Sequence, residues 1–272
     1  MMKVKEKIKD IKCSIKSKKK VATIYLILRT LVIICMLLEF FRGDIFNAFL
    51  CLLSLILFIL PYFIEKRFKI DLPNTLEVII MLFIFSAEIL GEINNFYGII
   101  PYWDSILHTL NGFLAAAVGF ALFDLLNDNV KGIHLSPIFL SIVAFCFSMT
   151  IGILWEFFEY GMDKYFNMDM QKDEIINSIS SVKLNNDNNE TIIIDNIKYS
   201  AIYNVDKNNE EKITIINNGY LDIGLHDTMK DLFVNFIGAV IFSIFGYLYI
   251  HNKEKYKFID NFIPVKVSDD KS

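Results

Sequence analysis

The sequence has few cysteines and none of the short motifs that mark the commonest enzyme classes. The four cysteines are Cys13, Cys35, Cys51 and Cys146, and no two of them form a C-x-x-C pair. A disulfide framework and a zinc or redox site made of cysteines are therefore not expected. A G-x-S-x-G elbow, a P-loop and a nucleotide-binding Gly-rich turn are also missing, which argues against nucleotide hydrolysis. We expect neither a nucleotide cofactor nor a nucleic-acid partner.

The chain is instead rich in apolar residues. They make up 54% of its 272 residues, and Phe alone contributes 25. The mean hydropathy of +0.43 is too high for a soluble domain of this size. A membrane-spanning helix needs about 20 such residues. Six segments approach that length: Val21 to Phe41, Ile45 to Ile64, Thr75 to Leu90, Trp103 to Leu125, Pro137 to Tyr160 and Met229 to Ile250. The sequence predicts an all-α integral membrane protein, a bundle of about six transmembrane helices.

Positive charge is sorted along the chain and predicts the orientation. Nine lysines precede the first apolar run, and such an excess marks the cytoplasmic side of a membrane. With six spans, the basic loop at residues 65–69 and the tail also fall inside. No small-residue cleavage site follows the basic arm, and Arg29 and Glu39 interrupt the first apolar run, so we read that run as an uncleaved span. Both termini are predicted to be cytoplasmic.

This topology divides the chain into five parts. They are a basic cytoplasmic arm (1–20), transmembrane helices one to five (21–163), an external polar loop (164–226), the sixth helix (227–252) and a cytoplasmic tail (253–272). The loop is rich in Asn, Asp and Lys, yet it contains β-type runs at 191–194, 197–203 and 212–216, with turn signals at Asp195-Asn196 and Asn217-Asn218-Gly219. Alternation of apolar and polar residues favours a small β flap over a disordered loop.

Seven ionisable side chains lie within or beside the apolar helices. They are Asp104 and His108, then Glu156, Glu159 and Asp163, then Asp227 and Asp231. The spacing within each group places its members on one helical face. The six-span topology brings all three groups to the same outer depth. Four further polar residues extend the set: Glu88 and Glu92 near the outer end of the third span, and Asn111 and Asn235.

Carboxylates crowded in a membrane repel one another, and a divalent cation removes that repulsion. The expected ligands are Asp104, His108, Glu156, Glu159, Asp227 and Asp231. They suit Mg²⁺, Mn²⁺, Ca²⁺ or Zn²⁺, and the oxygen-rich set favours a hard ion. His108 and Glu156 are expected to supply acid–base catalysis. We predict that His108, Glu156 and Asp231 converge within about 8 Å of a common point.

Simpler interpretations stand beside this one. Asp104 and Asp227 lie where a helix N-cap is expected. Glycines 112, 119, 152 and 238 would allow close helix packing in lipid. A proton relay through His108 and a carboxylate pair that shares a proton is the chemical alternative to a metal site.

Three motifs, in order, resemble the YjdF-like bacterial membrane proteins. They are Trp103-Asp-Ser-Ile-Leu-His-Thr-Leu-Asn-Gly-Phe113, Gly152-Ile-Leu-Trp-Glu-Phe-Phe-Glu-Tyr160 and His226-Asp-Thr-Met-Lys-Asp-Leu-Phe-Val-Asn-Phe-Ile-Gly-Ala239. The likeness covers about half of the chain and implies a membrane fold and a polar site, but no reaction. A looser similarity to VanZ-like proteins, which are linked with glycopeptide resistance, rests on the same kinds of helix. The implied location is the bacterial cytoplasmic (inner) membrane.

Three functions follow from these features. The first is a metal-dependent enzyme that acts at the outer leaflet on a lipid or lipid-linked envelope substrate. The alternatives are a proton- or cation-coupled transporter, and a non-catalytic envelope or resistance factor that a structural ion holds together. The inner halves of the spans carry few polar residues, mainly Arg29 and Asp124, which favours a one-sided site. The lipid bilayer is the expected partner, and the sequence does not set the oligomeric state.

Overall fold

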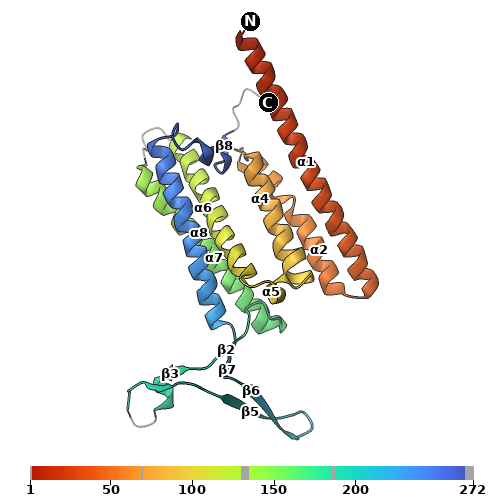
Figure 1. Cartoon of the computed structure of the whole chain (residues 1–272), viewed down its shortest axis with the longest axis vertical. Coiled ribbons are helices and arrows are strands. Elements are labelled where there is room, and N and C mark those ends of the chain that lie inside the picture. The colour runs from red at the N-terminus through yellow and green to blue at the C-terminus, as the bar shows by residue number, and fades with distance from the viewer. Residues whose placement is uncertain (1, 69, 130–134, 186–187, 267–272) are drawn as a thin grey trace. The chain divides into compact units, whose positions relative to one another are not determined.

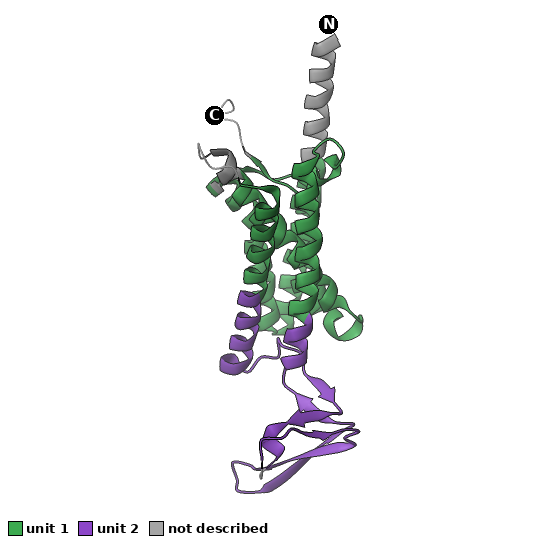
Figure 2. Cartoon of the chain, turned by 90° about the vertical axis from the view of Figure 1, so that its left-hand side faces the viewer, with its two compact units in different colours: residues 1–152, 231–272 green, residues 153–230 purple. Residues whose placement is uncertain are grey.

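The computed structural model describes the backbone of residues 2–68, 70–129, 135–185 and 188–266, and the side chains of residues 19–67, 70–124, 135–185 and 188–265. Most lysine side chains of the predicted basic arm and the last six residues of the predicted tail lie outside these ranges. The chain divides into two compact units, shown in Figure 2. Unit 1 comprises residues 1–152 and 231–272, and unit 2 comprises residues 153–230.

Five helical stretches of the described residues are long and apolar enough to cross a membrane. They are α1 (Met2–Arg42), α2 with α3 (Ile45–Leu57 and Leu60–Phe68), α6 (Trp103–Asn129), α7 (Pro137–Phe166) and α8 (Leu225–His251). Gly43, at φ +83°, ends α1 in a left-handed conformation that favours glycine. Asp44 then begins α2, because its carboxylate accepts the Asn47 N–H at 3.0 Å. The sequence therefore encodes a sharp reversal between the first two spans.

The third predicted span differs from an ordinary transmembrane helix, so a bundle of six spans is not confirmed. It consists of α4 (Asn74–Ile84), which continues directly into a π-helical segment, η1 (Phe85–Ile93). π-helical turns are rare and often lie at functional positions. Glu88 and Glu92 both fall in this segment. The chain then turns through Asn95, at φ +56°, and the short helix α5 (Phe96–Ile99) to reach α6.

Unit 1 has two main apolar cores (Figure 1). One lies between α1, α2 and α4 around Val32, Cys51 and Met81. The other lies between α6, α7 and α8 around Phe120 and Phe242. The segment after α8 forms η3 (Lys257–Asn261) and β8 (Val265–Lys266), and β8 pairs antiparallel with β1 (Ile70–Asp71). The C-terminal segment is thereby tied to the connection between α3 and α4.

Unit 2 contains the predicted β-rich region between the helices α7 and α8. Its strands form three antiparallel pairs: β2 (Glu174–Ile176) with β7 (Tyr220–Asp222), β3 (Ile179–Ser181) with β4 (Ile192–Ile194), and β5 (Tyr199–Val205) with β6 (Glu211–Asn217). A 3₁₀ turn, η2 (Val182–Leu184), follows β3. Asn196 and Asn218 have positive φ angles, 55° and 67°, as the predicted turns require. A β-rich region between the last two spans is thus confirmed.

Candidate functional site

The polar group with the clearest geometry lies in unit 1, where Asp104 and His108 of α6 meet Asp231 of α8. His108 Nε2 lies 3.4 Å from Asp104 Oδ1 and 3.8 Å from Asp231 Oδ2. One ligand atom of each residue lies within 4.8 Å of the other two. His108 and Asp231 are buried, with 8% and 1% of their surface exposed. The structure therefore brings together three of the six predicted metal ligands, and we call them the triad.

Close packing of α6 against α8 puts these side chains within reach of one another. A Cβ atom on Gly238 would lie 2.0 Å from the Thr109 carbonyl oxygen, and one on Gly112 would lie 2.1 Å from that of Asn235. Only a residue without a side chain leaves room for such an approach of two backbones. The predicted role of these glycines in helix packing is confirmed. His108 and Asp231 each lie within two turns of these crossing points, so the glycines position the triad.

Asn111 and Asn235 lie one turn deeper, next to the triad. Asn111 Nδ2 donates to Asn235 Oδ1 at 3.2 Å, and Asn235 lies against Gly152, where a Cβ atom would meet its amide nitrogen at 2.7 Å. Ser148 adds a contact that the sequence reasoning missed, because its hydroxyl donates to the Gly112 carbonyl oxygen at 2.7 Å. The sequence could have indicated Ser148, because it lies one turn before Gly152 on the same helical face.

Apolar side chains follow this polar layer along the same helices. Phe120 and Phe242 are fully buried and pack edge to face, with ring centroids 6.0 Å apart. Ala116, Ala117 and Ala144 fill the space around them. An apolar core thus follows Asn235 along α8, and beyond it Ser243 of α8 and Asp124 of α6 are single polar residues.

The distances within the triad, 3.4 and 3.8 Å from His108 Nε2, are compatible with ligands that share one ion. Two ligands held about 2.1 Å from one ion at a tetrahedral angle lie about 3.4 Å apart. The atoms of His108 and Asp104 have that separation. Two carboxylates and one imidazole also form a common donor set for divalent cations.

The predicted N-cap interpretation does not describe Asp104 or Asp227. Asp104 is the second residue of α6, and Asp227 is the third residue of α8. In both cases the carboxylate lies inside the first helical turn, beyond the N-cap. A negative charge there still interacts favourably with the helix N-terminus.

Asp163 and Asp227, both in unit 2, accept hydrogen bonds from backbone N–H groups and are not part of the triad. Asp163 accepts the N–H groups of Met170 and Gln171 at 2.6 and 2.8 Å. Asp227 accepts the Lys172 N–H at 2.8 Å and pairs with Lys230 Nζ at 3.1 Å. Charge-assisted hydrogen bonds of this kind are strong. These two carboxylates therefore fasten the segment between α7 and β2 to the two helices.

The other predicted residues are not brought into the triad. Glu156 and Glu159 are buried in unit 2, and Glu159 accepts the Trp155 indole N–H at 2.8 Å. Glu88 and Glu92 lie in η1 and are not among the three grouped residues. The predicted convergence of Glu156 with His108 and Asp231 stays a prediction, as does a role of Glu156 in catalysis.

Several apolar helices around a buried polar group define a multi-pass membrane protein. The chain belongs to the family described as "Predicted membrane protein (DUF2238)", which matches residues 23–252. This family is consistent with the YjdF-like resemblance. An uncharacterised protein of Thermotoga maritima is 28% identical to the chain over 110 residues, which are 38% of this chain and 52% of that protein. The chain thus spans about half the length of this curated relative. No solved structure matches the chain.

Proposed function

We propose that the triad binds a divalent cation and that this ion is the functional centre of the protein. The observation that carries the proposal is the meeting of one imidazole nitrogen and two carboxylate oxygens, from α6 and α8, within 4.8 Å of one another. Three protein ligands leave a coordination position for water or substrate, as in catalytic metal sites. Mn²⁺, Zn²⁺ and Mg²⁺ are the ions that this mixed donor set suits best.

The arrangement supports a one-sided site more than a path for transport. Asn111 and Asn235 continue the polar surface for one turn, and the fully buried Phe120 and Phe242 then interrupt it. A proton or ion pathway needs a continuous series of polar groups or water beyond that point, whereas Ser243 and Asp124 are single polar residues on α8 and α6. We therefore place an enzyme ahead of a transporter. The non-catalytic alternative, a structural ion, uses the same ligands and differs only in lacking turnover.

The position of the triad favours an amphiphilic substrate. Asp104 and His108 lie in the first two turns of α6, near the end of a membrane helix, where lipid head groups meet water. A lipid or lipid-linked envelope precursor is the substrate class that reaches such a position. In this proposal His108 acts as a ligand of the ion.

We also propose that both termini lie in the cytoplasm of a bacterium. The nine lysines that precede the apolar part of α1 support this orientation. In Figure 1 the apolar span of α1, Lys19–Arg42, begins at the end of unit 1 where α8 ends, which supports an even number of crossings and so a crossing by α4 with η1. A cysteine placed at Asn188 of a cysteine-free chain should then react with an impermeant thiol reagent in intact cells. Labelling only after lysis would overturn the orientation.

The metal is tested with the purified full-length protein in detergent. After treatment with EDTA, Mn²⁺, Zn²⁺ or Mg²⁺ should raise the unfolding midpoint, because a ligand that binds only the folded state stabilises it by about 2.7 kcal/mol at a hundredfold excess over its Kd. His108→Gln should remove this response and lower the metal content measured by mass spectrometry. His226→Gln is the matched control, since His226 is a half-exposed histidine of unit 2 whose Nδ1 lies 3.3 Å from Asp222.

Two results would reject the metal site. One is a wild-type midpoint that neither EDTA nor any of the ions changes, together with no bound metal. The other is an ion response that His108→Gln and Asp231→Asn both keep. An enzyme is then separated from a structural ion by incubating the metal-loaded protein with bacterial lipid extract and following new products by mass spectrometry, with Asp231→Asn as the inactive comparison.

A further inference from the structure

Unit 1 contains two free cysteines on its first pair of helices. Cys35 belongs to α1 and Cys51 to α2. They are 16 positions apart in the sequence, so no short motif marks them as a pair. Neither belongs to the triad, which lies on α6 and α8. Their relation depends on how the first two helices fold against each other.

The reversal between α1 and α2 places both cysteines at the same depth. Gly43, at the turn, lies eight positions after Cys35 and eight positions before Cys51. A helix rises about 1.5 Å per residue, so each cysteine lies roughly 12 Å from the turn along its helix. The helices α1 and α2 pack side by side (Figure 1). The two cysteines are therefore level with each other on neighbouring helices.

Both side chains also lie on the inner faces of these helices. Cys51 is fully buried in the apolar core between α1, α2 and α4, and Cys35 packs against that core. The two thiols interact with each other. Leu52, the next residue of α2, has 47% of its surface exposed and so faces away from the core. The fold thus brings two sulfur atoms together at one level of the hairpin.

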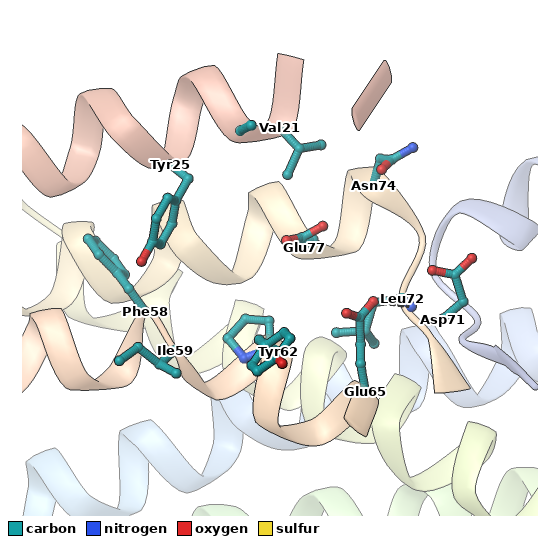
Figure 3. Close-up of a pocket in the computed structure, with 12 residues that line it drawn as sticks. Val21, Tyr25, Phe58, Ile59, Tyr62, Glu65, Asp71, Leu72, Asn74 and Glu77 are labelled. Carbon is teal, nitrogen blue, oxygen red and sulfur yellow. Dashed lines mark hydrogen bonds between the residues drawn. The ribbon is translucent and has the colours of Figure 1, made fainter. Parts of the chain in front are cut away.

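Cys35 is the accessible member of the pair. It is partly exposed, whereas Cys51 is not exposed at all. A cavity of about 450 Å³ lies between α1, α3, β1 and α4 (Figure 3), but neither cysteine lines it. Cys35 instead belongs to the apolar span Lys19–Arg42, whose exposed surface faces hydrocarbon in a membrane. A reagent therefore reaches the pair from the bilayer, at Cys35.

We propose that Cys35 and Cys51 form a disulfide that joins α1 to α2, with a lipid-soluble quinone as the electron acceptor. Two S–H bonds break and one S–S bond forms. The two electrons and two protons pass to the quinone, which becomes a hydroquinone. A quinone suits this position because it dissolves in hydrocarbon, where charged oxidants are excluded. The bond closes a loop around Gly43 and holds the two helices at this level.

The first test uses the purified full-length protein in detergent, with Cys13→Ser and Cys146→Ser so that only the pair remains. The reduced protein is treated with diamide, a two-electron oxidant of thiols, then denatured and labelled with a maleimide that carries a polyethylene glycol chain. We expect two labels per chain before oxidation, none after it, and two again after dithiothreitol. The oxidised chain should stay monomeric on a non-reducing gel. Two labels per chain after diamide would overturn the proposal.

A matched variant tests whether the facing geometry matters. Cys51→Ala combined with Leu52→Cys moves one thiol by a single position, from the inner face of α2 to its exposed face at nearly the same depth. We expect this pair to oxidise at least about tenfold more slowly than the native pair, because exchange depends on the access of one sulfur to the other. Cys51→Ser leaves one thiol and should keep one label. Equal rates for the native and the displaced pair would overturn the proposal.

The electron acceptor is tested with the same protein in lipid nanodiscs. Decylubiquinone should oxidise the pair and yield one hydroquinone per chain, and it should act at least about tenfold faster than glutathione disulfide, a charged oxidant that stays in water. Faster oxidation by glutathione disulfide would overturn the route through the bilayer. His108→Gln should oxidise like its parent, which separates this pair from the proposed metal centre.

Discussion

Asp227 and Asp231 are one helical turn apart on α8, yet their carboxylates have different partners. Asp227 accepts a backbone N–H from Lys172 and pairs with Lys230. Asp231 lies 3.8 Å from the His108 imidazole and is almost wholly buried. A carboxylate that holds backbone N–H groups fastens a chain segment, whereas one that meets an imidazole and a second carboxylate can share an ion with them. Two aspartates on the same helical face can therefore have different roles.

The largest effect is expected where α6 and α8 cross, because this close contact positions the triad. Gly238→Ala would place a Cβ atom 2.0 Å from the Thr109 carbonyl oxygen. Because backbone cannot yield there cheaply, we expect a loss of about 3 kcal/mol in unfolding free energy, together with loss of the metal response. Thermal unfolding in detergent measures both. Gly161→Ala of unit 2 meets no atom within 4 Å and should be neutral or stabilise by about 0.5 kcal/mol. Similar results for the two variants would show that the crossing is not tight.

The next prediction compares the two aspartates directly. Asp231→Asn should abolish the stabilisation by added metal, about 2.7 kcal/mol at a hundredfold excess of ion over Kd. Asp227→Asn should keep that stabilisation, because its carboxylate is engaged with Lys172 and Lys230. The readout is the metal-induced shift of the unfolding midpoint in each variant. Loss of the shift in both variants would extend the metal site to Asp227, and loss in neither would remove Asp231 from it.

A smaller effect is expected at the base of unit 2. Asp163→Asn leaves one oxygen for the two N–H groups of Met170 and Gln171, which the carboxylate now accepts at 2.6 and 2.8 Å. The loss of one charge-assisted bond should cost about 1.5 kcal/mol of local stability. Limited proteolysis between α7 and β2 should become faster, while the metal response stays unchanged. Glu190→Gln, an exposed loop residue, is the control. Unchanged proteolysis would show that Asp163 does not hold this segment.

The smallest effect concerns pH. Partial burial, followed by the nearby charges of Asp169, Asp163 and Asp222, raises the pKa of Asp173 above its ordinary value of 3.8. Its folded-state pKa then exceeds its unfolded-state pKa, so unit 2 is most stable below both and loses stability as pH rises from the ordinary value through the raised one. The side chain is exposed, so the loss should be only a few tenths of a kcal/mol. Hydrogen exchange of β2 as a function of pH should show this slope, and Asp173→Asn should flatten it. An unchanged slope in the variant would assign it to another group.

Periodicity and apolar length predicted the membrane helices well, because a bilayer demands long apolar runs. Asn196 and Asn218 also marked two turns correctly, since their positive φ angles suit asparagine. The π-helical geometry of η1 could not be predicted, because it depends on packing as well as on composition. Spacing correctly linked Asp104 to His108, but it could not tell Asp231 from Asp227. That difference depends on which residues approach from other parts of the chain.

The pairing of β1 with β8 affects how the chain is made. Ile70 and Asp71 leave the ribosome early, whereas their partners, Val265 and Lys266, leave it after α8. The hydrogen bonds between β1 and β8 therefore cannot form until the later helices have been synthesised. A chain that stops before β8 carries the five helical stretches that the structure describes as long enough to span a membrane, but it leaves the β1 backbone without its partner strand. The last residues to be made thus complete a pairing that begins near residue 70.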